Sequence, residues 1–355
     1  MEVSDKFGLE EVLIKSHAPV KSEIPKACFK EIKDLKFEGM SDEYANLYMA
    51  RVKGSQYLMN ASFDRYFVDI DTLTAKKADI GYDMRTLANC FINGKYMLML
   101  RLFNDMAIFR GLQHIGQIEF QTKFEYCKNN QLIHGRYAQQ AGNTVYVVDR
   151  YGDLYRIEWQ DIKEGIDHKK LIKRNVENFY VDKELGMAIV DWNCTLSLDN
   201  KVEVDLTKVN TQAKWTIVSC IAKCWIVSGD HKDKASMASI SKKGDIRSTL
   251  KFKLTSNGYK GNYGRKYGGI YALQKVYAIG MRGIMMAIER DGCCHLISVD
   301  YGRLTVLQSI DSIVPRDVVE DEYERIVRSV TATAKRGQFM VGGLQWTRLI
   351  TVKYK

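Results

Sequence analysis

The feature that most constrains the fold of this chain is a strand–turn–strand unit that recurs along its length. In each unit an apolar strand is followed by a short polar turn and a second strand in which apolar and polar residues alternate, the pattern of a β-hairpin. The seven units are QYLMNAS with YFVDID, KYMLML with MAIFRG, NTVYVVD with LYRIEW, GMAIVD with TLSLD, CWIVSG with ASMASIS, GIMMAIE with CHLISVD, and QFMVGG with RLITVKY. Their first strands begin near residues 56, 95, 143, 186, 224, 283 and 338. This spacing, roughly 38 to 60 residues, is typical of four-stranded propeller blades.

Further strand patterns stand before and after the hairpins, where each blade needs its innermost and outermost strands. Innermost strands are predicted at 46–52, 85–92, 131–138, 176–182, 214–220, 269–279 and 325–334. Outermost strands are predicted at 117–124, 201–206, 246–254 and 303–310. The last hairpin ends at Lys355, so we expect the segment EIKDLKFEG, 31–39, to pair with the C-terminal blade. Closing the ring in this way would remove the exposed edges of an open β array.

The predicted fold is therefore all-β, a seven-bladed β-propeller whose ring is closed by an N-terminal strand joining the C-terminal blade. We expect one propeller domain over residues 29–355, preceded by an N-terminal arm over 1–28 that holds Pro19 and Pro25, two of the three prolines. Seven hairpins could also form a pair of β-sandwiches or a double barrel.

One unit carries a recognisable family motif. VYVVDRYGDLYRIEW, in the third predicted blade, is similar to the strand, Asp-Gly-type turn and Trp-ended strand of WD40 repeats, with Trp159 in the place of the family tryptophan. The Gly-His dipeptide of the family is absent, and the pair Asp191–Trp192 falls in a turn instead of at a strand end. The chain thus resembles a divergent WD40-like propeller, in its strand rhythm more than in its motifs.

The composition is that of a globular protein. The chain is 46% hydrophobic and 27% charged, enough apolar residues to bury a large core. Charges are scattered through the first 21 residues where a signal peptide would be apolar, and no window approaches 18 uncharged apolar residues, so neither secretion nor a membrane span is expected. We expect an intracellular protein, cytoplasmic or nuclear. Most of the eight cysteines lie in apolar runs without a CxxC pair, as buried small hydrophobic residues do.

The sequence predicts neither an enzyme nor a metal or cofactor site. Its six histidines show no HxxxH or HxH spacing, and GxSxG and P-loop motifs are absent, so no catalytic residue is assigned. A propeller can still assemble a site at its central channel from distant loops, which keeps a channel enzyme or small-ligand binder open as an alternative. We expect the strand-end carboxylates to accept backbone N–H bonds in turns. These are Asp69, Asp71, Asp149, Asp191 and Asp300.

The net charge of +10 is concentrated in one sector. Residues 228–267 contain ten Lys or Arg against three Asp, and the stretch 255–275 is rich in Gly and Tyr and holds no acid. By the predicted register, one face of the ring gathers basic and tyrosine side chains from hairpin turns and from the long inter-blade loop. The residues predicted to bind a partner are Lys232, Lys234, Tyr259, Lys260, Tyr263, Arg265, Lys266, Tyr267, Arg290, Arg150 and Arg65.

Three interpretations of this sector stay open at the level of sequence. Basic residues interleaved with tyrosines suit single-stranded nucleic acid, Tyr and Arg also anchor protein interfaces, and 255–269 could be a glycine-rich connector. The function predicted is a non-catalytic interaction scaffold or adaptor, a subunit of a larger protein assembly. The alternative is a propeller that contacts RNA or single-stranded DNA through residues 228–267. Protein partners are expected, with no membrane span and no small-molecule substrate.

Overall fold

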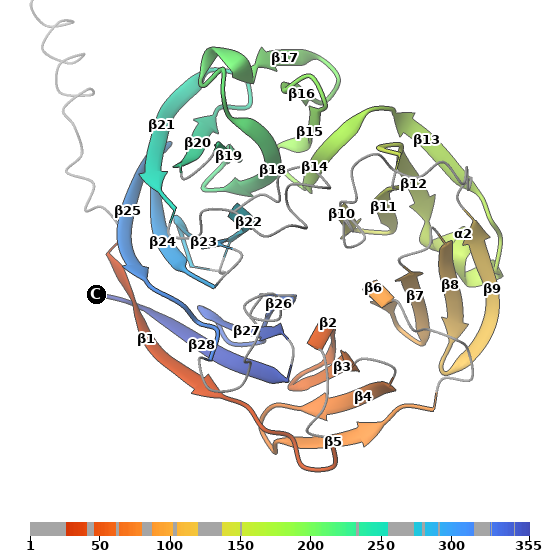
Figure 1. Ribbon diagram of the computed structural model, residues 1–355. Coiled ribbons are helices and arrows are strands. Elements are labelled where there is room, and N and C mark those ends of the chain that lie inside the picture. Colours follow the sequence, from red (N-terminus) through yellow and green to blue (C-terminus); the bar gives the residue numbers. More distant parts are fainter. Residues whose placement is uncertain are drawn as a thin grey trace, which may run out of the picture.

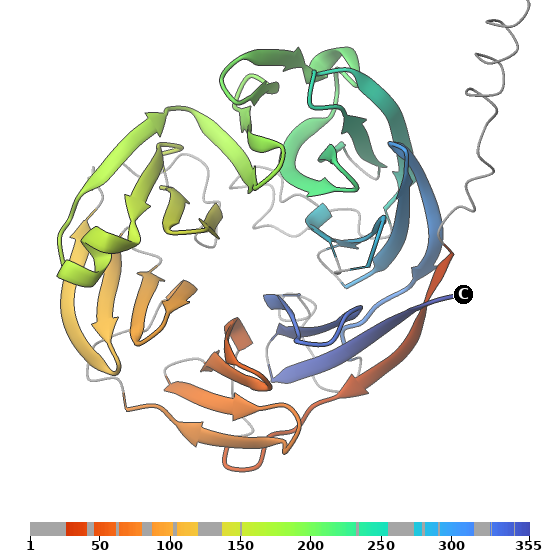
Figure 2. The same cartoon turned by 180° about the vertical axis from the view of Figure 1, so that it is seen from behind.

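The computed structural model of the protein describes residues 26–40, 46–61, 64–79, 87–101, 105–119, 137–149, 151–231, 234–254, 273–278, 281–289, 292–315, 327, 329–343 and 345–355. Seven four-stranded antiparallel sheets stand as blades around a ring (Figure 1). The fold is the seven-bladed β-propeller that the hairpin repeat predicts, and the opposite view shows the same closed circle (Figure 2). Within the described residues, no helix is long and apolar enough to cross a membrane.

Each blade is built from four strands in order from the channel outward, except that the last blade takes its outermost strand from the N-terminus. The innermost strands are β2 (Asn46–Lys53), β6 (Leu87–Asn93), β10 (Tyr137–Ala141), β14 (Val176–Asp182), β18 (Lys214–Ile221), β22 (Leu273–Ala278) and β26 (Ser329–Ala332). The second strands are β3 (Gln56–Ala61), β7 (Tyr96–Arg101), β11 (Thr144–Val148), β15 (Gly186–Asp191), β19 (Cys224–His231), β23 (Ile284–Glu289) and β27 (Gln338–Gly343).

The third strands are β4 (Asp64–Asp69), β8 (Asp105–Arg110), β12 (Leu154–Glu158), β16 (Thr195–Leu198), β20 (Lys234–Ile240), β24 (Cys294–Asp300) and β28 (Trp346–Tyr354). The outermost strands are β5 (Thr74–Lys77), β9 (Gln113–Glu119), β13 (Lys169–Lys173), β17 (Val202–Asp205), β21 (Ile246–Lys253), β25 (Arg303–Ile310) and β1 (Ala27–Asp34). In the described residues, two short helices interrupt the pattern, α2 (Trp159–Glu164) after β12 and the 3-10 helix η1 (Leu206–Lys208) after β17.

The core lies between neighbouring blades, because each sheet packs face to face against the next. One apolar cluster joins Val190 and Leu196 of the fourth blade to Trp215 and Trp225 of the fifth. The second strands are covered on both faces, which explains their continuous apolar sequences; every residue of β23 is buried. The outermost strands are covered on one face only, and β21 alternates between exposed and half-buried residues along its length.

The ring closes in the seventh blade, which contains both the first and the last of the described strands. Strand β1 pairs antiparallel with β28, from Ala27 opposite Tyr354 to Asp34 opposite Arg348. This confirms the predicted closure, although β1 begins four residues before the segment 31–39 proposed from the sequence. Beyond β1 the chain turns onto the first blade, where the N–H of Glu38 donates to the carbonyl of Leu73 at 2.8 Å.

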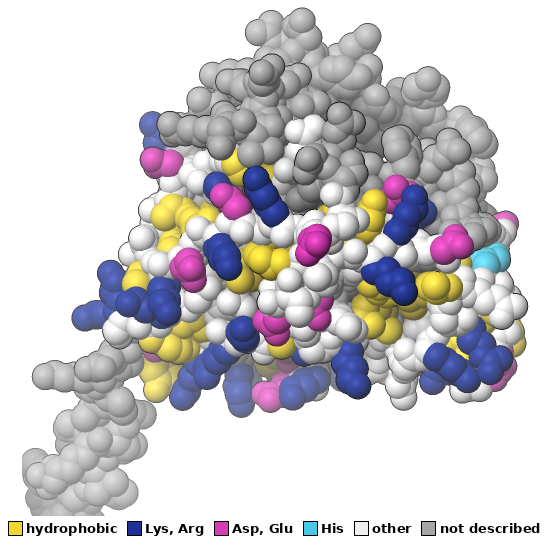
Figure 3. Space-filling model, turned by 90° about the horizontal axis from the view of Figure 1, so that it is seen from below, with side chains coloured by type: hydrophobic (Ala, Val, Ile, Leu, Met, Phe, Trp, Pro, Cys, Tyr) yellow, Lys and Arg dark blue, Asp and Glu magenta, His cyan; other side chains and the backbone are white. Residues whose placement is uncertain are grey.

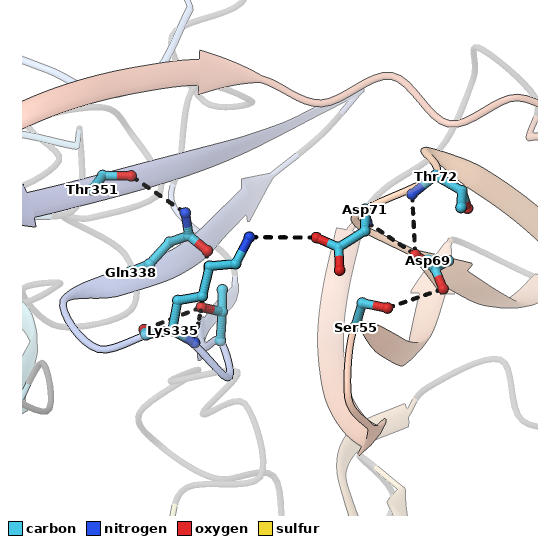
Figure 4. A network of polar contacts seen from close by, with 8 residues as sticks. Ser55, Asp69, Asp71, Thr72, Lys335, Gln338 and Thr351 are labelled. Carbon is cyan, nitrogen blue, oxygen red and sulfur yellow. Dashed lines mark hydrogen bonds and ion pairs between the residues drawn. The ribbon is translucent and has the colours of Figure 1, made fainter.

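Side chains also join the seventh blade to the first across the seam. The Lys335 ammonium lies 3.5 Å from a carboxylate oxygen of Asp71, and Asp71 in turn donates its backbone N–H to Asp69 (Figure 4). The hydroxyl of Thr331 donates to the carbonyl of Met49 at 2.9 Å. The segment 26–40 and these contacts tie the two ends of the sequence into one ring.

Candidate interaction surface

The order of strands fixes which turns share a face of the ring. Turns between first and second strands and between third and fourth strands emerge on one face, here called the lower face. Turns between second and third strands, together with the connections from blade to blade, emerge on the upper face. In the edge-on view of Figure 3 the lower face lies along the bottom of the picture.

Two of the residues predicted to bind a partner lie in the described chain. Lys234 begins β20 beside an upper-face turn and is exposed, as the prediction requires. Arg65 also lies beside an upper-face turn, in β4, but its side chain is only 7% exposed and therefore adds little charge to the surface. The other nine lie outside the described residues: Arg150, Lys232, Tyr259, Lys260, Tyr263, Arg265, Lys266, Tyr267 and Arg290.

The described part of the basic sector 228–267 is spread across the fifth blade. Lys234 lies at the upper face, whereas Lys242 and Lys243 lie in the lower-face turn between β20 and β21. Between them, the exposed cations of β21 are Arg247, Lys251 and Lys253. These residues form a basic strip across the outer edge of the blade. The six cations therefore do not gather on one face.

The lower face carries a larger basic surface that no single stretch of sequence reveals. Lys and Arg side chains gather along the lower edge of the ring in Figure 3. Exposed cations in the described lower-face turns and their flanking strand ends are Lys53, Lys95, Arg110, Lys163, Lys183, Lys201, Lys223, Lys242, Lys243, Arg282, Arg303, Lys335 and Arg336. Exposed acids in the same turns are Asp71, Glu164, Asp167, Glu184, Asp199 and Asp245. The cations outnumber the acids, so this face has a positive net charge.

Contacts within the lower face leave most of this charge available to a partner. Lys223 lies 3.4 Å from Glu184, but both side chains are more than half exposed, and exposed pairs of this kind are weak. Tyr354 is held more firmly, because its hydroxyl donates to the carbonyl of Arg282 at 3.2 Å. The Arg336 guanidinium lies over the Tyr354 ring at 5.8 Å. The end of β28 is thereby fixed beside two arginines.

Carboxylates at the strand ends organise turns, as expected from the sequence. Asp149 accepts the N–H groups of Tyr151 and Asp153, both at 2.9 Å. Asp191 accepts the N–H groups of Asn193 and Thr195 in the same way. Asp69 likewise accepts the N–H group of Asp71. Asp71 itself forms the ion pair with Lys335 described above. Asp300 ends β24, and its hydrogen bonds stay a prediction.

Burial makes two of the cysteine thiols poor nucleophiles. It raises the pKa of Cys90 to about 12, and it is also the main reason why the pKa of Cys220 is raised to about 12. A thiol reacts as its thiolate, so neither group is prepared for covalent chemistry at neutral pH. No disulfide joins cysteines within the described part of the chain.

One buried cluster of polar side chains was not found from the sequence. Glu289, Cys293 and His295 bring a carboxylate, a thiol and an imidazole within 4.8 Å of one another in the sixth blade. These donor types can bind a transition metal. The sequence signal is the run ERDGCCH, 289–295, which a search limited to His–His and Cys–Cys spacings passes over.

No family model matches the sequence, and no curated protein does. Among solved structures, the WD40 repeats of RRP9 are similar with a TM-score of 0.61 and 10% identity, over 93% of this chain and 100% of that one. YCF48 bound to D1 peptide is similar with a TM-score of 0.57 and 12% identity, over 93% of this chain and 99% of that one. A chain of the mitotic checkpoint complex has a TM-score of 0.61 and 9% identity, over 92% of this chain and 96% of that one. The protein therefore has the seven-bladed propeller fold of WD40 repeat domains, with a sequence far removed from theirs.

Proposed function

We propose that the protein is a non-catalytic scaffold subunit of a larger protein assembly, and that its lower face binds an acidic surface of a protein partner. The observation that carries this proposal is the excess of exposed cations in the lower-face turns. They come from all seven blades, so they span the whole ring. A surface of this breadth suits a folded partner with complementary charge, because complementary potentials accelerate and orient association.

The rigidity of the ring supports the same proposal. Hairpin turns fixed by carboxylates and by a closed ring lose little freedom on binding, which leaves more of the contact energy for affinity. Similar propellers come from the mitotic checkpoint complex and from YCF48 bound to a peptide. Each of those propellers has a protein or peptide partner in its structure. The cytosol or the nucleus is the compartment that we propose for this chain.

A protein partner fits the lower face better than nucleic acid does. Single-stranded nucleic acid needs rows of exposed aromatic rings for base stacking. The described lower-face turns and chain end offer Tyr301, which is 76% exposed, and Tyr354, which is held by arginine contacts. Acids such as Asp199 and Asp245 also stand among the cations, and they interrupt the continuous positive track that a phosphate backbone follows.

Charge reversal on matched positions tests the proposal. The test variant carries Lys53→Glu, Lys95→Glu and Lys201→Glu in lower-face turns. The control variant carries Lys30→Glu, Lys76→Glu and Lys170→Glu on exposed positions of the outermost strands β1, β5 and β13. Partners are crosslinked to the wild-type protein in its source cell and identified by mass spectrometry. Each partner is then purified, and its rate of association is measured with the wild type, the test variant and the control variant.

We expect the lower-face variant to associate at least about tenfold more slowly at low salt, and the control to change far less. Equal effects of the two variants would overturn the lower face as the binding surface. The nucleic-acid alternative is tested by binding to mixed RNA and single-stranded DNA at low salt. Tight binding that is lost in a Lys260→Glu, Arg265→Glu, Lys266→Glu variant would replace the scaffold proposal with a nucleic-acid function of the sector 228–267.

A further inference from the structure

A five-residue turn with the same backbone hydrogen bonds recurs in three blades, so the side chains at equivalent positions of the turn can be compared. In the turn at 149–153, the N–H of Asp149 donates to the carbonyl of Asp153 and the N–H of Gly152 donates back to Asp149. The turns at 241–245 and 289–293 have the same two backbone hydrogen bonds, at 2.8 to 3.0 Å. In two of these turns the side chain of the first residue adds further hydrogen bonds. The Ser241 hydroxyl, like the carboxylate of Asp149, accepts N–H groups from within its turn.

The sixth blade departs from this pattern at its first residue. Glu289 has one methylene more than aspartate, and its carboxylate oxygen lies 2.7 Å from Nε2 of His295. The fifth residue of the turn is Cys293, whose Sγ lies 3.6 Å from the same Nε2. Glu289 is 0%, Cys293 1% and His295 4% exposed. The backbone of the turn is therefore retained, while its side chains form a buried cluster with three different donor atoms.

The imidazole is held from its other side. Nδ1 of His295 lies 2.7 Å from the hydroxyl of Ser309, which stands directly opposite on the neighbouring strand β25. The ring of Phe252 packs on the imidazole with centroids 4.7 Å apart. A hydrogen bond at the second ring nitrogen and a fixed ring plane are what histidine ligands of metals generally have. His295 is thus oriented with Nε2 toward Glu289 and Cys293.

We propose that Glu289, Cys293 and His295 bind one transition-metal ion of the zinc class. Nitrogen, sulfur and oxygen donors together suit zinc, and three protein ligands leave a fourth tetrahedral position for water. A thiolate and a carboxylate also balance the two charges of the ion in a site that excludes solvent.

The distances require only a small adjustment. Sulfur and nitrogen bound to tetrahedral zinc lie about 3.5 Å apart, and Cys293 and His295 already have that spacing. Oxygen and nitrogen ligands lie about 3.3 Å apart, so the Glu289 carboxylate has to withdraw by roughly 0.6 Å, within the reach of a flexible side chain. In the competing arrangement, Nε2–H donates to Glu289 and the Ser309 hydroxyl donates to Nδ1, with a proton in the place of the metal.

The neighbouring cysteine provides a matched control. Cys294 is equally buried, but it belongs to the apolar core between the sixth and seventh blades, and its thiol donates to the carbonyl of Gly292. The full chain and its Cys293→Ser and Cys294→Ser variants are purified without chelators, and bound zinc is measured by mass spectrometry. We expect about one zinc per chain in the wild type and in the Cys294→Ser variant, and at least tenfold less in the Cys293→Ser variant.

Two further measurements keep the test decisive if Cys293→Ser does not fold. Cobalt(II) alone is added to the metal-free wild type, and thiolate-to-cobalt absorption in the near ultraviolet is expected to appear at one equivalent. The Glu289→Gln variant keeps the size of the side chain and an oxygen that can accept from Nε2–H, so it is expected to fold and to lose the metal. Absence of zinc and of the cobalt signal in the wild type would overturn the proposal, as would equal zinc in the Cys293→Ser and Cys294→Ser variants.

Discussion

Asp69 illustrates how a single carboxylate fixes a turn and makes it sensitive to acid. Its carboxylate accepts the N–H groups of Asp71 and Thr72 at 2.9 and 3.1 Å and the hydroxyl of Ser55 at 3.0 Å. The hydrogen bond from Thr72, followed by those from Asp71 and Ser55, lowers the pKa of Asp69 in the folded protein. Each of these donors favours the ionised form of the carboxylate.

This lowered pKa predicts how Asp69→Asn changes the response to pH. A depressed folded-state pKa gives stability that is fully present above the unfolded value, about 3.9, and is lost as the pH falls through the folded value. We therefore expect the wild type to be more stable than Asp69→Asn at neutral pH, and the difference to shrink below about pH 4. Urea unfolding across that range measures it, with Glu203→Gln at an exposed position of strand β17 as the control. A difference that is constant with pH would contradict the prediction.

Strand β1 is the element on which ring closure depends. It contributes a whole outermost strand to the seventh blade, and without it β28 would present an open edge. Its charged residues Lys30, Glu31 and Lys33 are exposed, and the side chain of Ile32 is 38% exposed. Changes at Glu31 and Ile32 therefore act mainly through the backbone.

Paired prolines at these positions test the importance of closure. Adjacent N–H groups of a strand point to opposite sides, so one of the two prolines in Glu31→Pro, Ile32→Pro must remove a donor that faces β28. We expect a loss of about 3 kcal/mol or more in unfolding free energy, with new oligomers in light scattering. The Glu31→Ala, Ile32→Ala control should stay monodisperse and close to wild type. A proline variant as stable as the alanine variant would show that closure contributes little.

The sequence predicts elements well where strands are covered on both faces. The second strands begin within one residue of the predicted positions, because apolar runs flanked by Gly, Asn or Asp turns leave little freedom of register. The outermost strands β5 and β13 were not predicted, since TAKK and KKLIK lack alternating apolar residues, and neither strand contains a buried residue. Strand β9 lies at Gln113–Glu119 and not at 117–124, because a tight turn at Gly111 brings the chain back directly after β8.

At the scale of the whole molecule, the positive lower face could not be predicted from local sequence. Its cations are contributed one or two at a time by turns from Lys53 to Arg336, so no window of the sequence shows a cluster. Residues 228–267 do form a cluster in the sequence, yet their described cations are divided between both faces and the outer edge of one blade. Closing the chain into a ring converts a dispersed pattern into one charged surface.

A charged face of this extent predicts a strong dependence of association on salt. The Debye length falls from about 30 Å at 0.01 M salt to about 10 Å at 0.1 M, so attraction between extended surfaces is screened over this range. We expect the rate of association with the acidic partner to fall by at least about tenfold between these two conditions, while the dissociation rate changes little. Stopped-flow measurements separate the two rates. An association rate that does not depend on salt would exclude steering by the lower face.

The closure of the ring by β1 also has a consequence for synthesis of the protein. Among the described strands, β1 is made first, and its partner β28 (Trp346–Tyr354) is made last. At about 5–20 residues per second, β1 waits for roughly a quarter of a minute to a minute without its partner. During this delay, the alternating charges of Lys30, Glu31, Lys33 and Asp34 discourage pairing with strands of other nascent chains. The charge pattern of β1 therefore protects the strand during the interval before β28 is synthesised.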